Sequence, residues 1–216
     1  MFMTTAKLSK ADVVQVYSQT AFIYDLWGKL TETNARKKAL ALAHIQNGES
    51  VLEVAIGTGL TFQEILRANP NGANVGVDLT PAMLEKAKSR AAKLGIPHYH
   101  SAVGDAYDLK FPNHQFDVLM NNHMFDLLPE KDFALVLEEF KRVLKPGGRI
   151  ILVNMTHGEY AYQRFWELVY RFNPKWLGGC RGVLLSPVMQ TAGFHNIHRE
   201  TASQFGFPSE IIVATT

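Results

Sequence analysis

The feature that most limits how this chain can fold is a short apolar run that leads into two closely spaced glycines. Residues 50–55 read SVLEVA, a pattern typical of a strand buried in a parallel sheet. Gly57 and Gly59 follow, and they permit a sharp turn and a close approach of the backbone to a ligand. A helix is expected over residues 60–67, with its positive N-terminal end directed at this turn. The segment therefore predicts a nucleotide-like ligand.

Strand and helix patterns continue to alternate after this unit. Further strands are expected at residues 74–78, 98–103, 116–121 and 149–154. Helices are expected at residues 9–27, 33–45, 80–94, 130–144, 160–172 and 186–193. The short connections predict βαβ units in a doubly wound, Rossmann-like α/β sheet of about seven strands. The sheet would be mostly parallel, with residues 194–200 and 210–215 forming an antiparallel pair at its C-terminal end.

The composition narrows the class of protein. The chain has 216 residues, of which 47% are hydrophobic, and it shows no linker, so a single domain with a buried core is expected. A net charge of +2 gives no concentrated basic face for nucleic acid. One cysteine, no apolar leader and no long apolar run favour a cytoplasmic protein without a transmembrane segment, and peripheral membrane contact is left open. The histidines lack the spacing of a metal site, so no metal is expected.

The residues around the glycines distinguish between nucleotide-binding families. A dinucleotide fold requires a third glycine where this chain has Phe62, which is too large for close packing of helix on strand. A P-loop requires a lysine after the last glycine, and Leu60 and Thr61 stand there instead. Two acids complete the pattern: Asp78 ends one expected strand and Asp105 follows the next. Both lie at the carboxyl edge, where such sheets bind ligands.

Five segments in this order resemble the class I S-adenosylmethionine (SAM)-dependent methyltransferases. They are LEVAIGTG, VGVDLTPAML, GDAYDLKF, FDVLMNNHMFDLL and LKPGGRIILV, and they lie between residues 48 and 154, about half of the chain. The resemblance implies SAM as the methyl donor and S-adenosylhomocysteine as its product. One position departs from the family pattern: Ala55 stands at the first family glycine. Its single methyl group is expected to leave the loop intact and to weaken SAM binding only slightly.

The resemblance also implies which residues hold SAM. Glu53, Gly57 and Gly59 would hold the methionine part. Asp78 would accept hydrogen bonds from the ribose hydroxyls, and Asp105 would bind the adenine amino group. The remaining cofactor contacts expected from these segments are those of Thr58, Leu79, Met83, Ala106 and Asn121.

The N-terminal helices are expected to cover the cofactor. In methyltransferases of this type such a helix often forms a lid, and Tyr17 and Tyr24 lie in it. Tyr17 is a candidate contact of the cofactor and Tyr24 a candidate catalytic residue, with simple packing of an aromatic helix as the alternative. We therefore divide the single domain into a lid (1–47), a SAM-binding core (48–154) and an acceptor-side helix with closing strands (155–216).

A catalytic base is needed only if the methyl acceptor must lose a proton. His123 is the best candidate, because it follows the fourth strand at the edge that faces the cofactor and because histidine titrates near neutral pH. The alternative is a loop histidine that only packs or forms hydrogen bonds.

The acceptor is suggested by a narrower resemblance. The chain resembles the branch that contains ubiquinone/menaquinone C-methyltransferases and bacterial phosphatidylethanolamine N-methyltransferases. This resemblance rests on residues 17–27, on NNHMFDLLPE, and on the tail from WLGGCR to FPSE. A small or amphiphilic acceptor is expected, either a phospholipid amine or a quinol. A methyltransferase of a soluble natural product, an NAD(P)-dependent oxidoreductase and a SAM-binding protein without catalysis are the alternatives, and the oligomeric state is left open.

Overall fold

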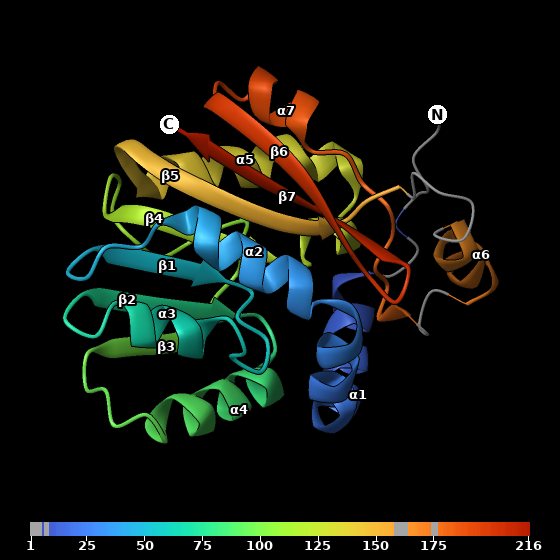
Figure 1. Cartoon of the computed structure of the whole chain (residues 1–216), viewed down its shortest axis with the longest axis horizontal. Helices are drawn as coiled ribbons and strands as arrows, with labels where there is room; N and C mark the ends of the chain where they lie inside the picture. The colour runs from blue at the N-terminus through green and yellow to red at the C-terminus, as the bar shows by residue number, and fades with distance from the viewer. Residues whose placement is uncertain (1–5, 7–8, 158–163, 174–176) are drawn as a thin grey trace.

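Helices cover both faces of one twisted sheet (Figure 1). A computed structural model of the chain describes residues 6, 9–157, 164–173 and 177–216, apart from the side chains of residues 20–24, 164 and 167. The elements are, in chain order, α1 (Lys10–Thr31), α2 (Thr33–Ala43), β1 (Ser50–Val54), α3 (Phe62–Ala68), β2 (Ala73–Asp78), α4 (Pro81–Ala92), β3 (Tyr99–Val103), β4 (Phe116–Asn122), η1 (Phe125–Leu127), η2 (Glu130–Asp132), α5 (Phe133–Val143), β5 (Leu144–Met155), α6 (Arg164–Phe172), α7 (Ser186–Thr191), β6 (His195–Gln204) and β7 (Phe207–Thr215).

The sheet has seven strands in the order β3-β2-β1-β4-β5-β7-β6. The first five strands in this order, β3 to β5, are parallel to one another, and β7 runs antiparallel to both β5 and β6. This confirms the predicted Rossmann-like architecture with an antiparallel C-terminal part. Because β1, β2, β3 and β4 are parallel, the residues that follow them meet at one edge of the sheet.

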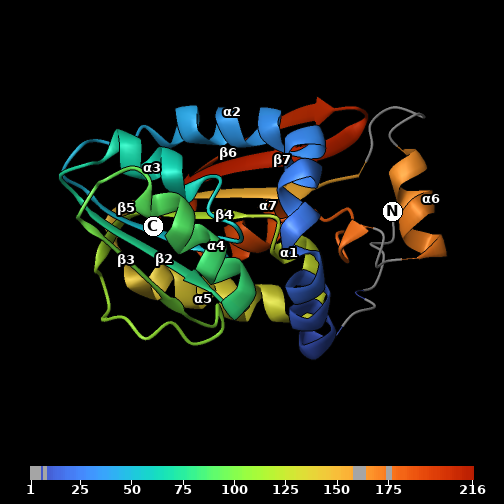
Figure 2. The ribbon, with the colours of Figure 1, turned by 90° about the horizontal axis from the view of Figure 1, so that it is seen from below.

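The core consists of two layers of apolar side chains, one on each face of the sheet. Figure 2 shows α2, α3 and α4 over one face and α5 over the other. Successive strand residues supply opposite layers: Val51 packs with the buried residues of α2, α3 and α4, whereas Leu52 packs with those of α5 and α7. Strands that are buried on both faces read as continuous apolar runs, which is why the sequence identified them.

Several boundaries differ from the sequence prediction, among them the end of the first helix, which runs to Thr31 and not to residue 27. The helix expected at residues 130–144 begins at Phe133, after a 3-10 turn. The strand expected at 149–154 extends back to Leu144 and includes the Pro-Gly-Gly segment. The closing strands are longer than expected and are joined by Phe205 and Gly206, whose φ angles of 49° and 76° give a two-residue hairpin turn.

The aromatic-rich helix is described from Arg164 to Phe172, and residues 160–163 of its predicted span lie outside the described part. Among the described residues no helix is both long enough and apolar enough to cross a membrane.

Candidate functional site

The loop after β1 is shaped by residues with positive φ. Ala55, Gly57 and Gly59 have φ angles of 59°, 54° and 82°. A Cβ atom at Gly59 would lie 2.9 Å from the Cα of Ala87, so this glycine allows α4 to pack directly on the loop. Ala55 adopts the same left-handed conformation with a side chain, which costs about 1–2 kcal/mol. The predicted loop is therefore formed, with strain at the position where the chain departs from the family pattern.

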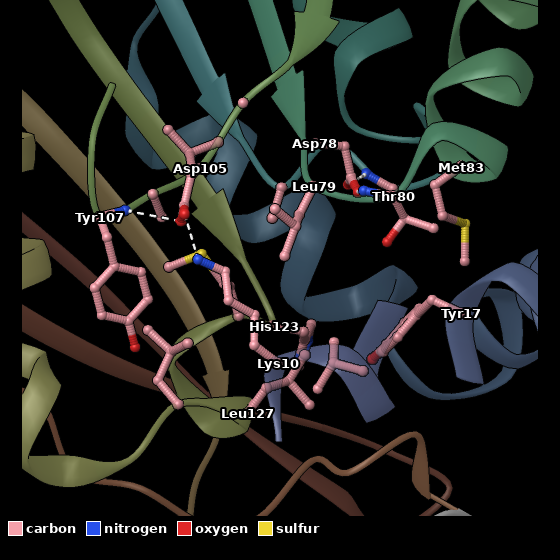
Figure 3. Close-up of a pocket in the computed structure, with 18 of the residues that line it drawn as sticks. Lys10, Tyr17, Asp78, Leu79, Thr80, Met83, Asp105, Tyr107, His123 and Leu127 are labelled. Carbon is pink, nitrogen blue, oxygen red and sulfur yellow. Dashed lines mark hydrogen bonds and ion pairs between the residues drawn. The ribbon is translucent and has the colours of Figure 1, made fainter. Parts of the chain in front are cut away.

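A cavity of about 440 Å³ opens beside this loop, at the carboxyl edge of the sheet (Figure 3). Its volume lies within the range of ~300–1,000 Å³ that is common for small-molecule sites. The predicted site residues in its wall are Tyr17, Gly57, Asp78, Leu79, Met83, Asp105, Ala106 and His123. The wall also contains residues that the sequence did not single out, among them Lys10, Tyr107, Asn122, Met124, Leu127 and Leu128.

Asp78, the last residue of β2, holds the loop in place. Its Oδ2 accepts a hydrogen bond from the backbone N–H of Gly57 at 2.8 Å, and its Oδ1 accepts one from the N–H of Thr80 at 2.8 Å. Burial raises the pKa of Asp78, and the two N–H groups oppose this shift. Since an ionised carboxylate offers about four acceptor positions, Asp78 retains capacity for hydroxyl donors inside the cavity.

A second cavity, of about 40 Å³, adjoins the first and has charged side chains in its wall. Oε1 of Glu53 accepts a hydrogen bond from Nδ2 of Asn122 at 3.2 Å, while Oε2 is buried and has no hydrogen-bond partner among the described residues. Burial raises the pKa of Glu53 to about 8. Arg36 of α2 lines the same space. The carboxyl group of Glu32 also lines it. Two carboxyl groups and a guanidinium around one small cavity suit a ligand that carries both an ammonium and a carboxylate.

The two cavities share part of their wall. Ala55, Gly57, Asn122 and His123 line both of them. These residues follow or end β1 and β4, which are adjacent strands of the sheet. A ligand that extends from the large cavity into the small one would therefore pass His123.

His123 has a fixed position directly after β4. Its φ angle is 51°, and its ring centroid lies 5.9 Å from that of Phe207. Nδ1 lies 3.1 Å from Oδ2 of Asp126, and both side chains are almost completely buried. Burial by itself opposes protonation of the imidazole, but the carboxylates of Glu32 and Asp126 outweigh it and hold the pKa of His123 above its usual value.

The first helix closes the outer end of the large cavity. Lys10, at the start of α1, forms an ion pair with Asp105 after β3, as Figure 3 shows. The Lys10 ammonium also lies 4.9 Å from the centroid of the Tyr107 ring. Tyr107 donates a hydrogen bond to Oδ2 of Asp132 at 2.9 Å. The contacts of Lys10 with Asp105 and of Tyr107 with Asp132 thus join segments on both sides of the cavity at its outer end.

Several predicted site residues are not in the wall of the large cavity. Glu53 and Thr58 line only the small one, and Gly59 lies in neither wall. The Thr58 hydroxyl donates to Oδ1 of Asp25 at 2.5 Å, which ties α1 to the loop.

The amide of Asn121 donates to the carbonyl of Val54 at 2.8 Å, so this side chain joins β4 to β1 and lines neither cavity. The next residue, Asn122, takes the predicted place in the wall, because successive side chains of a strand point to opposite faces. The side chain of Tyr24 lies outside the described residues.

Comparison with known proteins identifies the family. Residues 51–148 match the family model of a methyltransferase domain. The chain is 31% identical over 172 residues to the ubiquinone/menaquinone biosynthesis C-methyltransferase UbiE of Burkholderia vietnamiensis, an alignment that covers 77% of this chain and 69% of the relative. The chain belongs to the SAM-dependent methyltransferases. The methyltransferase is also 32% identical over 164 residues to a demethylmenaquinone methyltransferase of Symbiobacterium thermophilum, covering 73% of this chain and 64% of the relative.

A solved structure agrees with the fold of the methyltransferase. The phosphoethanolamine N-methyltransferase 2 of Haemonchus contortus, in complex with phosphomonomethylethanolamine and S-adenosylhomocysteine, superposes with a TM-score of 0.75. Its sequence is 17% identical, and the match covers 97% of this chain and 60% of that one. The enzyme class and the cofactor expected from the sequence are therefore confirmed: the methyltransferase uses SAM as its methyl donor.

Proposed function

We propose that this methyltransferase acts on a small or amphiphilic acceptor of the quinol type, with His123 as the general base. The observation that carries this proposal is the place of His123 in the wall common to both cavities. Beside it, the segment after β4 supplies an apolar surface of Met124, Leu127 and Leu128, which suits an aromatic ring. The relatives named as ubiquinone/menaquinone C-methyltransferases favour a quinol over a lipid amine.

The two cavities fit the two halves of SAM. Leu79, Met83, Asp105 and Ala106 would hold the adenine in the large cavity, with Asp78 on the ribose. The small cavity would take the amino-acid end. There the α-ammonium would supply the partner that Oε2 of Glu53 lacks among the described residues, and the Arg36 guanidinium would bind the carboxylate. This unmatched buried carboxyl oxygen is the structural feature that fits SAM best.

SAM, when bound, supplies an electrophilic methyl group, and the electron pair of the broken carbon–sulfur bond stays on sulfur. The protein's own part is to orient the acceptor and to take its proton. Positioning two reactants side by side can contribute roughly 7–11 kcal/mol to lowering a barrier. Overall the acceptor exchanges one hydrogen for a methyl group, and the proton goes to Nε2 of His123. A neutral imidazole is required for this role, so turnover should rise with pH through the raised pKa of His123.

We assign the parts of the domain accordingly. Residues 1–47 would form the cover, because Val13 and Tyr17 of α1 line the large cavity. Residues 48–154 would bind the cofactor. Residues 155–216 would close the acceptor side, where Phe207 packs on His123.

The acceptor class can be tested by incubating the purified protein and SAM with three kinds of acceptor: a substituted naphthohydroquinone, vesicles of phosphatidylethanolamine, and a simple water-soluble phenol. S-adenosylhomocysteine is quantified, and the product is analysed by mass spectrometry. We expect methylation of a ring carbon of the hydroquinone. Turnover with phosphatidylethanolamine alone would show that the acceptor is a lipid amine, and turnover with the soluble phenol alone would point to a natural-product enzyme.

The role of His123 is tested in the same assay. His123→Ala should lose most of its turnover and keep its affinity for SAM, since a general base contributes about 10²–10⁴-fold to a rate. His198→Ala is the matched control, because His198 is an exposed histidine of β6 paired with Glu200. Full turnover of His123→Ala with every accepted substrate would exclude a base role.

A further inference from the structure

The histidine in the common wall is held by a carboxylate that the sequence analysis did not single out. Asp126 lies in the 3-10 turn η1, three residues after His123, and is fully buried. Its Oδ2 is 3.1 Å from Nδ1 of the imidazole and also accepts a hydrogen bond from the backbone N–H of Met155 at 2.9 Å. The backbone carbonyl of Asp126 accepts a hydrogen bond from the N–H of Arg181 at 3.3 Å. The carboxylate is therefore fixed from β5, and the backbone of Asp126 is fixed from the C-terminal part of the chain.

The imidazole is fixed equally well. The backbone N–H of His123 donates to the carbonyl of Val153 at 2.6 Å, and the left-handed φ of 51° turns the residue out of the line of β4. Such conformations in a residue other than glycine are costly and cluster at functional sites. Phe207 packs beside the ring. Nε2 has no hydrogen-bond partner within the described part of the chain, although it is buried.

We propose that Asp126 is a positioning residue that makes His123 a proton acceptor for the methylated substrate. This inference rests on the function proposed above. Oδ2 of Asp126 already accepts the backbone N–H of Met155 and lies 3.1 Å from Nδ1, so in this proposal it acts as an acceptor and the imidazole carries its proton on Nδ1. The lone pair is then on Nε2, the nitrogen without a described partner. The proton that the acceptor loses moves to Nε2, and the imidazolium that forms has its positive charge next to the carboxylate.

The burial of the pair limits what can exchange this proton. Only 2% of the His123 side chain is exposed, and none of the Asp126 side chain. His123 can therefore exchange a proton only with a group that occupies one of the two cavities. This separates it from His198, of whose side chain 60% is exposed.

Other charged groups also act on His123. Glu32 raises the pKa of the imidazole and Arg36 lowers it, while Asp126 acts through both its charge and its hydrogen bond. The Cys180 thiol interacts with the Asp126 side chain and lies 4.0 Å from the Tyr17 hydroxyl. Burial raises the pKa of this thiol well above the usual value, so it stays neutral. Replacing Asp126 by the neutral Asn removes one of the two negative charges near the imidazole and should lower the pKa of His123.

The first test observes the unaltered pair in the free protein, and a variant serves only to assign its signals. Nitrogen-15 NMR of histidine-labelled protein gives the tautomer of each neutral imidazole, and the signals of His123 are assigned by their absence from His123→Gln. We expect the Nδ1–H tautomer for His123. An Nε2–H tautomer would overturn the proposal, because the nitrogen without a described partner would then carry a proton and could not accept one.

The second test compares Asp126→Asn with Asp117→Asn. Asp117 stands near the start of β4, accepts a hydrogen bond from the backbone N–H of Ser50 at 2.9 Å and pairs with Lys145. Asp117→Asn therefore controls for the loss of a carboxylate that binds a backbone N–H group. For Asp126→Asn we expect kcat to fall about 10- to 100-fold, within the span of general-base effects. We also expect the rising limb of the pH profile to move to lower pH, with SAM affinity retained. Asp117→Asn should keep the kcat and the profile of the unaltered protein.

The outcomes separate this proposal from the function on which it rests. If His123→Ala keeps full turnover, the base role fails, whatever Asp126→Asn does. If His123→Ala is inactive while Asp126→Asn keeps both its kcat and its pH profile, the positioning role alone is refuted. A purely structural role of Asp126 would lower the melting temperature without moving the pH profile. If Asp126→Asn does not fold, the tautomer of the unaltered protein still decides.

Discussion

Lys10 of α1 and Asp105 after β3 form an ion pair across the outer end of the large cavity. The same carboxylate is our candidate for binding the adenine amino group, so the lysine competes with the cofactor for it. We expect Lys10→Met to tighten SAM binding by up to about fivefold, since an exposed pair of this kind contributes about 0–1 kcal/mol. Titration calorimetry measures this directly, with Lys29→Met, an exposed lysine of the same helix, as the control. Weaker binding by Lys10→Met would show that Lys10 holds the cofactor instead.

Asp78→Ala should weaken SAM binding at least tenfold, because buried hydrogen bonds to a charged group contribute about 1.5–3 kcal/mol. The substitution also releases the N–H groups of Gly57 and Thr80, so a melting curve must accompany each titration. Asp108→Ala is the matched control, since that carboxylate is exposed and pairs with Lys110. Unchanged affinity in a folded Asp78→Ala protein would contradict the ribose role.

SAM binding should release a proton through Glu53. Its pKa of about 8 means that the buried carboxyl is mostly protonated at pH 7 in the free protein. The α-ammonium of SAM beside Glu53 favours the carboxylate, so the pKa of Glu53 falls on binding. The affinity for SAM should therefore rise from pH 6 to about 7.5. This range ends below the usual pKa of an α-amino group, ~7.7–8.0, so the ammonium stays charged within it.

Calorimetry at pH 7 in buffers of different ionisation enthalpy counts the protons released by this step. We expect about one proton at most for the unaltered protein and for His123→Ala, and none for Glu53→Gln. Proton release that persists in Glu53→Gln and disappears in His123→Ala would assign the titration to the histidine.

Ala55→Gly should stabilise the protein. Relief of the left-handed strain, about 1–2 kcal/mol, outweighs the ~0.5–1 kcal/mol that glycine loses through its greater freedom in the unfolded chain. A net gain of about 1 kcal/mol corresponds to a rise in Tm of ~2–4 °C for a chain of this size. Ala134→Gly, at an exposed position of α5, should instead lower the melting temperature. A lower Tm for Ala55→Gly would mean that the methyl group makes contacts that outweigh the strain.

The order of strands and helices could be predicted because buried strands have a simple pattern. Residues 51–52 and 118–120 are apolar runs that face both sides of the sheet, and the glycines between β1 and α3 mark the turn. The hairpin between β6 and β7 could not be predicted in the same way. Its turn is Phe205-Gly206, and two-residue turns with two positive φ angles usually begin with Asn, Asp or Gly. For this reason the residue pattern does not indicate that β6 and β7 continue to the Phe205-Gly206 turn.

The candidate site was predictable where it depends on the loops that end the strands. Asp78, Asp105 and His123 were expected at one edge, and the structure places all three in one cavity wall. Asn122 was missed in favour of Asn121, since the sequence does not tell which face of β4 each amide occupies. Asp126 was missed because a spacing of three residues brings two side chains together only when the intervening backbone forms a tight turn.

The common wall has a consequence for how far this sequence can diverge. Its four residues, Ala55, Gly57, Asn122 and His123, belong to two adjacent segments whose relative position is set by the backbone ladder between β1 and β4. That ladder places few demands on side-chain identity. Substitutions can therefore accumulate in the surrounding helices and in the C-terminal hairpin, and the choice of acceptor can change with them, while the point at which the two cavities meet stays in place.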